Sequence, residues 1–298
     1  MKLGMIGLGR MGAGMTERLR RHGHEVVGFD VRPDVTEVPT IPDLVQALPT
    51  PRVAWVMVPS GQPTEESVQE LAGLLEPGDV VVDGGNSNYK DSIRRGGMLA
   101  ESDIGFIDAG VSGGVWGLQE GFCLMVGGEA EHVARLRPAF DALAPHGGFV
   151  HAGPVGAGHF TKMVHNGVEY GLMHAYGEGY ELLRASELGI DVPAVVNAWG
   201  QGSVVRSWLL ELLALGLAED PELDRIRGYA EDSGEGRWTV EEAVRLGVPA
   251  NVLATALFAR FTSRQEDSPA MKVVAVLRQQ FGGHAVKGSE GATPLVKE

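Results

Sequence analysis

Hydrophobic and polar positions follow two different rhythms along the chain. In the first half, short apolar runs alternate with stretches of helical periodicity, which is typical of a doubly wound parallel sheet with helices on its faces. The predicted strands are residues 2–8, 25–29, 53–58, 80–83, 105–108, 123–126 and 149–151. The predicted helices in this half are residues 12–21, 41–48, 65–75, 92–102 and 130–143.

Helical periodicity alone continues after a Gly-Pro-Val-Gly segment at residues 153–156, which is the expected hinge. The predicted helical stretches are residues 157–188, 192–217, 239–246, 251–263 and 270–280. The pattern therefore predicts three parts. These are an α/β domain over 1–154, an all-α domain over 155–287 and a loose tail over 288–298.

The composition is that of a globular protein and disfavours several classes of partner. Of 298 residues, 44% are hydrophobic, and the net charge of −14 argues against nucleic acid, which needs a basic face. The single cysteine, Cys123, excludes disulfide frameworks and cysteine-based metal sites, and we expect no metal. We see neither a membrane span of roughly 20 apolar residues nor a signal-peptide pattern. A cytoplasmic location without membrane contact is expected.

A glycine-rich turn lies between the first predicted strand and the first predicted helix. It consists of Gly7, Leu8, Gly9, Arg10, Met11 and Gly12, in the pattern G-x-G-x-x-G. The glycines allow a tight turn and close approach to a pyrophosphate, and the helix N-terminus offers free N–H groups to the phosphates. Among 43 glycines the pattern alone is weak. Its place between strand and helix predicts a Rossmann-like dinucleotide-binding domain.

An acidic residue, Asp30, ends the second predicted strand. A carboxylate at this place accepts hydrogen bonds from the adenosine ribose and repels a 2′-phosphate, which favours NAD over NADP. Arg32 is close enough in sequence to hold a 2′-phosphate. NADP therefore stays a weaker alternative.

Small and polar residues follow three further predicted strands, where such sheets bind ligands. The candidates are Val58, Pro59, Asn86, Ser112, Gly113 and Gly114. Small residues leave room for a ligand, and Asn86 and Ser112 offer neutral hydrogen-bond donors. One such segment could be an ordinary tight turn. Three in succession, each with a polar residue, favour a ligand site over ordinary turns.

The predicted helix over 157–188 carries an unusual polar face. Lys162, Asn166, Glu169 and Tyr170 are spaced i, i+4, i+7 and i+8, and His165 pairs with Glu169 at i, i+4. A solvated face also carries Lys and Glu, but each glycine inside a helix costs about 1 kcal/mol relative to alanine. The nearby glycines are Gly156, Gly158, Gly167, Gly171, Gly177 and Gly179. We therefore expect close approach to this backbone and one wall of an active site.

A lysine on such a wall can act as the base that oxidises an alcohol. It accepts the hydroxyl proton while hydride leaves for a nicotinamide, provided that burial or neighbouring cations lower its pKa to about 7–8. Asn166 can hold the hydroxyl, and Glu169 can act later as a general acid.

Taken together, the motifs resemble those of the decarboxylating 6-phosphogluconate dehydrogenases, a family within the β-hydroxyacid dehydrogenase group, in a short form. The resemblance covers nearly the whole chain, and its most specific segments are KMVHNGVEYG and DGGNSNYKD. The other matching segments are GLGRMG, GVSGG, GEGRWT, LFAR and FGGH.

The resemblance implies oxidative decarboxylation of 6-phosphogluconate to ribulose 5-phosphate and CO2, with reduction of NAD, as in the pentose phosphate pathway. It makes Lys162 the base and Glu169 the acid, with Asn166 beside them. The implied substrate-binding residues are Asn86, Ser112, Gly113, Gly114, His165, Tyr170, Arg260, Arg278 and His284. Asn86 also lies near the nicotinamide in this assignment.

Several positions depart from the family pattern. Ser233 stands where the family has a phosphate-binding lysine, and Val115-Trp116 replaces a Glu-Glu pair. Asp30-Val31 replaces an Asn-Arg pair that reads NADP, which supports NAD. Long members also have extra helices, so a dimer of this chain must be built differently.

We expect a homodimer or homotetramer, and the resemblance implies that Arg278 and His284 complete the neighbour's phosphate site. Two alternatives remain open. A non-decarboxylating 3-hydroxyacid dehydrogenase for a smaller acid would keep Lys162 and Asn166 without the phosphate cluster. A nucleotide-binding module without activity would be expected to lose Lys162, which is present.

Overall fold

The structure is a computed structural model that describes residues 1–282 and residue 287. His284 and the predicted tail over 288–298 lie outside the described residues. The contacts divide the chain into two compact units. One consists of Met1–Leu182 and Ser233–Ala254, and the other of Leu183–Asp232 and the chain from Thr255 onward. The predicted division at residue 154 stays a prediction.

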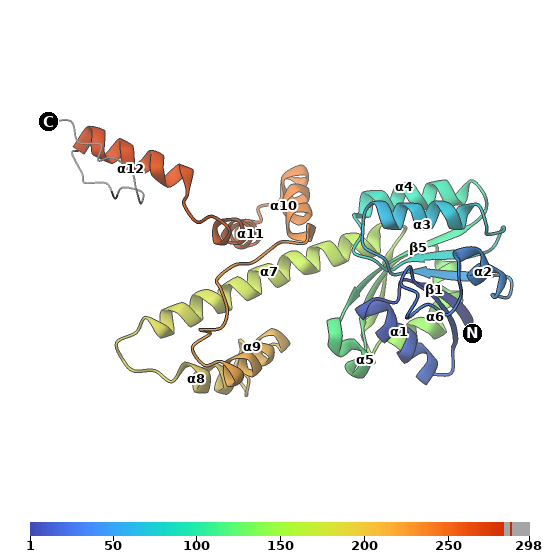
Figure 1. Cartoon of the computed structure of the whole chain (residues 1–298), viewed down its shortest axis with the longest axis horizontal. Helices are drawn as coiled ribbons and strands as arrows, with labels where there is room; N and C mark the ends of the chain where they lie inside the picture. Colours follow the sequence, from blue (N-terminus) through green and yellow to red (C-terminus); the bar gives the residue numbers. More distant parts are fainter. Residues whose placement is uncertain (283–286, 288–298) are drawn as a thin grey trace. The chain divides into compact units, whose positions relative to one another are not determined.

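A seven-stranded sheet is the centre of the first unit, in the order β2-β1-β3-β4-β5-β6-β7 (Figure 1). The strands are β1 (Lys2–Ile6), β2 (Glu25–Phe29), β3 (Val53–Val56), β4 (Val80–Asp83), β5 (Gly105–Ser112), β6 (Cys123–Gly128) and β7 (Phe149–Gly153). Strands β1 to β5 are parallel, as predicted. Strand β6 is antiparallel to β5 and parallel to β7, so the predicted direction is wrong at this edge. Only residues 113–122 join β5 to β6, and a parallel crossover needs a dozen or more residues.

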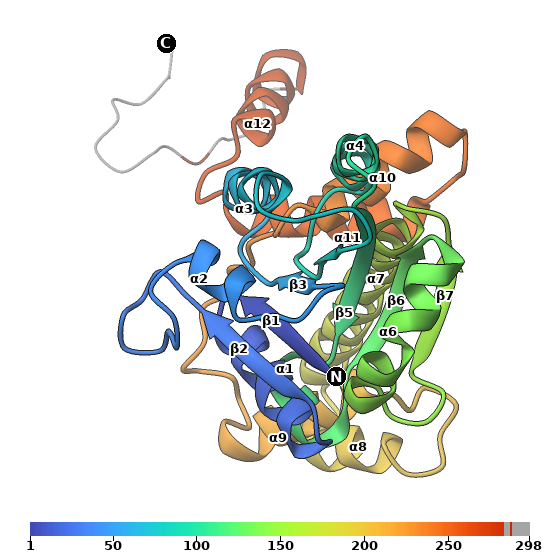
Figure 2. The ribbon, with the colours of Figure 1, turned by 90° about the vertical axis from the view of Figure 1, so that its right-hand side faces the viewer.

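Helices cover both faces of this sheet, which confirms the predicted α/β class. Figure 2 shows α3 and α4 on one face, and α1 and α6 on the other. The helices of this part are α1 (Arg10–Arg21), α2 (Ile41–Gln46), α3 (Gln62–Ala72), α4 (Tyr89–Ala100), η1 (Gly114–Trp116), α5 (Gly117–Glu120) and α6 (Ala130–Leu143). Strands β3 and β4 are buried along their whole length because both faces are covered.

The side chains of β5 alternate between two environments. Ile107 and Val111 belong to the apolar core that also contains residues of α1 and α6. Asp108 and Ser112 contact residues of α7 (Ala157–Arg184) instead. Because the period of a strand is two residues, one face of β5 builds the core and the other meets the helix that carries the predicted base.

Helix α10 (Glu235–Leu246) packs on α7 within the first unit. The Thr239 hydroxyl donates to the carbonyl of Met163 at 2.8 Å. A Cβ at Gly167 would lie 2.6 Å from the Thr239 methyl group, so glycine permits this contact. Helix α11 (Asn251–Ser263) begins in the first unit and continues in the second.

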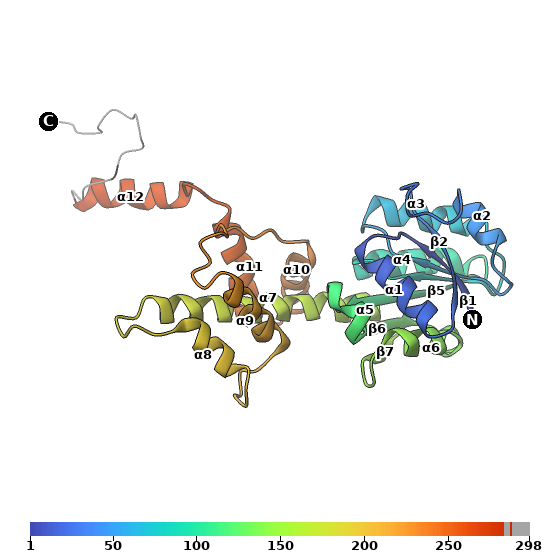
Figure 3. The ribbon, with the colours of Figure 1, turned by 60° about the horizontal axis from the view of Figure 1, so that its bottom comes forward.

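The second unit is helical, with α8 (Val192–Trp199) and α9 (Trp208–Glu219) packed on each other (Figures 1 and 3). The single helix predicted over 192–217 is wrong. Gly202 has φ +73° and interrupts the helix, and the Ser207 hydroxyl then caps α9 by accepting from Leu210 N at 3.1 Å. The last described helix is α12 (Pro269–Gly282). Among the described residues, no helix is long and apolar enough to cross a bilayer.

Two glycines of α7 allow a paired test of the helix–sheet contact. A Cβ at Gly158 would lie 2.6 Å from the carbonyl oxygen of Met125, whereas a Cβ at Gly177 would meet no described atom within 4 Å. We expect Gly158→Ala to lower the free energy of unfolding by about 1–3 kcal/mol through overpacking. Gly177→Ala should raise it by about 0.4–1 kcal/mol. Chemical denaturation of both variants measures this, and equal effects would contradict the contact.

Candidate active site

The glycine-rich turn has the geometry that a pyrophosphate needs. Gly7 has φ +96°, and a Cβ there would lie 2.6 Å from the carbonyl oxygen of Met57. Gly9 precedes α1, and a Cβ added to it would meet no described atom within 4 Å. Helix α1 begins at Arg10, two residues before the predicted start at Gly12. Its first N–H groups therefore lie beside open space at the end of β1, where a phosphate can approach.

Asp30 lies directly after β2 and is only 9% exposed. Its carboxylate accepts hydrogen bonds from Leu8 N at 2.7 Å and from Arg32 Nε at 3.1 Å. Burial opposes ionisation, but the hydrogen bonds from Arg32 and from the Arg32 and Leu8 backbone N–H groups outweigh it and lower the pKa of Asp30. The carboxylate is thus held charged at the predicted ribose position, and Arg32 is paired with it.

The loops after the next strands have the predicted open and polar character. Pro59 and Asn86 are exposed, and Val58 is partly buried. The turn predicted after residue 108 begins later, because β5 continues to Ser112. Gly113 follows with φ +141° and Gly114 with φ +54°. Ser112 is thus fixed in the sheet rather than in a loop.

Asp108 attaches the start of α7 to β5. Its buried carboxylate accepts from Gly156 N and His159 N, both at 2.7 Å. Negative charge at a helix N-terminus is favourable because the first N–H groups have no partner within the helix. A Cβ at Gly110 would collide with the Cβ of Lys162, which shows how closely the helix approaches the strand. The sequence reasoning missed Asp108, although a carboxylate inside the run GFIDAG is a detectable signal.

Lys162 belongs to a partly buried polar cluster and is itself only 7% exposed. Burial lowers the pKa of Lys162, although the charges of Glu169, Glu235 and Cys123 act in the opposite direction. Its Nζ lies 3.4 Å from His165 Nδ1. The pKa of Lys162 is therefore shifted in the predicted direction by burial, and no cation among the described residues contributes to the shift.

His165 links the lysine to the strand and to its neighbours. Its Nε2 lies 3.3 Å from Ser112 Oγ, and its Nδ1 lies 3.0 Å from Asn166 Oδ1. Lys162 and Asn166 therefore compete for one ring nitrogen. A cationic lysine can only donate to an unprotonated Nδ1, whereas the amide oxygen can only accept from a protonated one. The proton positions of these residues are coupled.

Glu169 and Tyr170 are the remaining predicted site residues of α7, and they follow Asn166 along the helix. Glu169 is partly exposed, 3.9 Å from His165 Nδ1. Tyr170 is buried, and its hydroxyl accepts from Ser233 N at 3.3 Å. A Cβ at Gly236 would overlap the Tyr170 ring, so the start of α10 lies directly against it.

The expectation about glycines on α7 holds only for the first part of the helix. Gly158, Gly167 and Gly171 are each approached closely by other segments. For Gly177 and Gly179 it is wrong, because a Cβ at either would meet no described atom within 4 Å.

The predicted phosphate-binding arginines belong to the second unit. Arg260 donates from Nη1 to the carbonyl of Glu231 at 2.9 Å. Arg278 is exposed on α12. The structure describes each within its own unit, and their grouping with Tyr170 stays a prediction.

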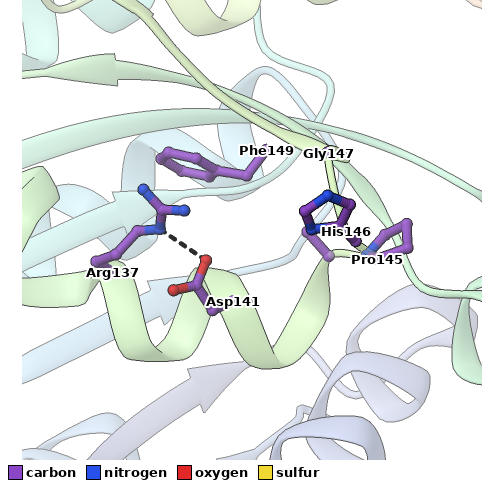
Figure 4. Close-up of a pocket in the computed structure, with 7 residues that line it drawn as sticks. Arg137, Asp141, Pro145, His146, Gly147 and Phe149 are labelled. Atoms are coloured by element: carbon purple, nitrogen blue, oxygen red, sulfur yellow. Dashed lines mark hydrogen bonds and ion pairs between the residues drawn. The ribbon is translucent and has the colours of Figure 1, made fainter.

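A separate hollow of about 530 Å³ lies between α6 and β7 (Figure 4). Two of its polar side chains are paired with each other, since Arg137 Nε donates to Asp141 at 2.6 Å, and the guanidinium lies over the Phe149 ring. It shares no lining residue with the cluster around Lys162.

Two family models match the chain. Residues 2–153 match the NAD binding domain of 6-phosphogluconate dehydrogenase, and residues 158–290 match the C-terminal domain of 6-phosphogluconate dehydrogenase. The chain belongs to the 6-phosphogluconate dehydrogenase family. The predicted family is thereby confirmed.

Individual relatives agree with this family. A putative 6-phosphogluconate dehydrogenase of Bacillus subtilis is 42% identical, over 96% of this chain and 99% of its own length. An NAD(+)-dependent, decarboxylating 6-phosphogluconate dehydrogenase of Haloferax volcanii is 40% identical, over 96% and 98%. The solved 6-phosphogluconate dehydrogenase of Plasmodium falciparum superposes with a TM-score of 0.82 at 26% identity, over 98% of this chain and 67% of its own.

The predicted ribose site at Asp30 leads us to expect a cofactor preference. Wild-type kcat/KM should be higher with NAD than with NADP, because like charges in contact cost several kcal/mol, on the order of 10²-fold or more. Asp30→Asn should narrow this gap by removing the charge and releasing Arg32. In the double variant Asp30→Asn/Arg32→Met, the increase in kcat/KM with NADP that Asp30→Asn produces should be lost again. A wild type that prefers NADP would show that Arg32, not Asp30, dominates.

Proposed function

We propose that this chain catalyses the NAD-dependent oxidative decarboxylation of 6-phosphogluconate to ribulose 5-phosphate and CO2. The observation that carries the proposal is the buried Lys162, with its lowered pKa, held against the end of β5 by the capped helix α7. Family membership and the names of the full-length relatives support the choice of substrate and cofactor.

The residues that would hold the cofactor are those of the turn and the ribose site. Gly7 and Gly9 leave the backbone of the turn accessible, and Asp30 is charged at the end of β2. A bound NAD would supply the acceptor for the hydride from C3 of the substrate.

Lys162 takes the proton of the C3 hydroxyl in this proposal, and its lowered pKa keeps more of it neutral at moderate pH. The 3-keto acid then loses its C1 carboxyl group as CO2, and the bonding electrons move to the C3 oxygen. The cationic Lys162 stabilises this enolate oxygen. Glu169, which is partly exposed, protonates the carbon that lost CO2.

The substrate hydroxyls are assigned to Asn166 and His165, with Ser112, Gly113, Gly114 and Asn86 in further contacts. Ser112 and His165 already contact each other. The phosphate is assigned to Tyr170 and Arg260, with Arg278 and His284 from a second subunit. Ser233 supplies no cation where the family has lysine.

We also propose a homo-oligomer, a dimer or tetramer, with shared active sites. Helix α12 has one exposed apolar residue after another: Met271, Val273, Val274, Val276 and Leu277. Contiguous exposed apolar surface usually marks an interface. A neighbouring copy of the chain would cover this helix and receive Arg278 from it.

Turnover on matched substrates tests the reaction. We expect kcat/KM to be far higher with 6-phosphogluconate than with unphosphorylated 3-hydroxyacids, and CO2 should form in equal amount to NADH. Lys162→Met should lower kcat by at least 10²-fold, the lower range for general base catalysis, and leave NAD binding close to wild type. Turnover without CO2 would favour the 3-hydroxyacid alternative. A variant that keeps more than about a tenth of wild-type kcat would remove Lys162 from this role.

Mixing two inactive chains tests the shared site. A Lys162→Met chain and an Arg278→Ala chain would form mixed oligomers in which one site has both defects and another has neither. Activity should therefore partly return on mixing. Mass spectrometry of the intact oligomers confirms that mixed species have formed. If they form without activity, each chain completes its own site.

A further inference from the structure

One arginine of α4 is buried at the edge of the sheet where the cofactor and substrate loops lie. Arg95 is 1% exposed, whereas the adjacent Arg94 is largely exposed. The two arginines share one partner, since both donate to the Glu65 carboxylate at the start of α3. Their hydrogen bonds, opposed by burial, lower the pKa of Glu65 to about 2, so this carboxylate stays charged.

Arg95 also reaches the loop after β4, which carries Asn86. Its Nη1 donates to Asp83 Oδ2 at 3.2 Å and to Ser87 Oγ at 3.3 Å. The fully buried Asp83 accepts in addition from Gly85 N at 3.1 Å and Ser87 Oγ at 2.8 Å. Gly85 and Ser87, the residues on both sides of Asn86, therefore both form hydrogen bonds with the Asp83–Arg95 ion pair.

The same guanidinium contacts the loop after β3. Its Nη2 donates to the carbonyl of Gly61 at 3.4 Å, and its Nε donates to Glu65 at 2.9 Å. The two loops also touch directly, because a Cβ at Gly85 would lie only 3.0 Å from the carbonyl oxygen of Val58. The planar guanidinium has five N–H donors in a fixed arrangement, so it can bind both loops at once.

We propose that Arg95 is a positioning residue that holds the loop carrying Val58 and Pro59 and the loop carrying Asn86 in one arrangement. The inference rests on the proposed function for the roles of these loops. Stability alone does not explain the arginine, because well-packed apolar residues often replace a buried ion pair without loss of stability. Arg94 already joins α4 to α3 through Glu65. Unlike Arg94, Arg95 also donates hydrogen bonds to the two loops.

Steady-state kinetics of matched variants test this role. Arg95→Met should raise KM for NAD and for 6-phosphogluconate and lower kcat, so that kcat/KM falls on the order of 10²-fold, as a displacement of about 1 Å can cause. Arg94→Met, which removes the exposed partner of the same Glu65, should stay within about twofold of wild type. Arg95→Lys should recover part of the loss, because an ammonium can neutralise Asp83 but cannot reach both loops.

Thermal unfolding and calorimetric titration of NAD accompany the kinetics. A purely structural role would lower kcat with the folded fraction and leave both KM values unchanged, and that result would overturn the proposal. If Arg95→Met does not fold, Asp83→Asn/Arg95→Met removes both buried charges and is measured in its place, together with Arg95→Lys. If Asp83→Asn/Arg95→Met and Arg95→Lys both have wild-type KM values, the proposal is also overturned.

The titration separates this inference from the proposed reaction. If wild type binds NAD but does not oxidise 6-phosphogluconate, the proposed substrate is wrong. Weaker NAD binding by about tenfold in Arg95→Met, with Arg94→Met unchanged, would still support the positioning role. If NAD binding is unchanged in both Arg95→Met and Arg94→Met, the positioning role of Arg95 is refuted.

Discussion

The contact between β5 and the start of α7 determines where Lys162, the proposed base, lies in the fold. The Asp108 carboxylate binds two backbone N–H groups of the helix, and Gly110 and Gly158 let the helix lie directly on the strand. A helix capped in this way has a fixed start and direction. Lys162, about one turn further on, therefore lies against Gly110 near the end of the strand.

Burial at this place changes the chemistry of the lysine. An exposed lysine is protonated at moderate pH, but removal from water penalises the charged form and lowers the pKa of Lys162. The polar neighbours of Lys162 are His165 and, through it, Asn166. The fold thus favours the neutral form that the proposed base needs by excluding water, and the same buried position would hold the cation after proton transfer.

The opposite use of burial is seen at Asp30 and Asp83. Both carboxylates are buried, but each is compensated by an arginine and by backbone N–H donors. Asp30 places a negative charge at the predicted ribose site, and Asp83 organises the loop around Asn86. Buried charge is tolerated here because it is paired and hydrogen-bonded, and such pairs are directional.

Local patterns in the sequence were sufficient for much of this description. The alternation of strands and helices and the spacing of Lys162, Asn166 and Tyr170 depend on periods of two and 3.6 residues. The glycine-rich turn and the acidic residue after β2 are short local motifs. Such local signals can be recognised in the sequence without knowledge of the rest of the fold. The break at Gly202 was missed because apolar periodicity continues on both sides of it.

Other properties depend on groups that are remote in sequence. The antiparallel direction of β6 follows from the short link to β5, and the capping by Asp108 joins residues 48 positions apart. The lowered pKa of Lys162 depends on how completely α7, β5 and their neighbours exclude water. By itself the sequence determined the chemical groups and their spacing along each element. Only the tertiary structure decided which groups lose water and which gain a partner, because desolvation and hydrogen bonding depend on neighbours in space.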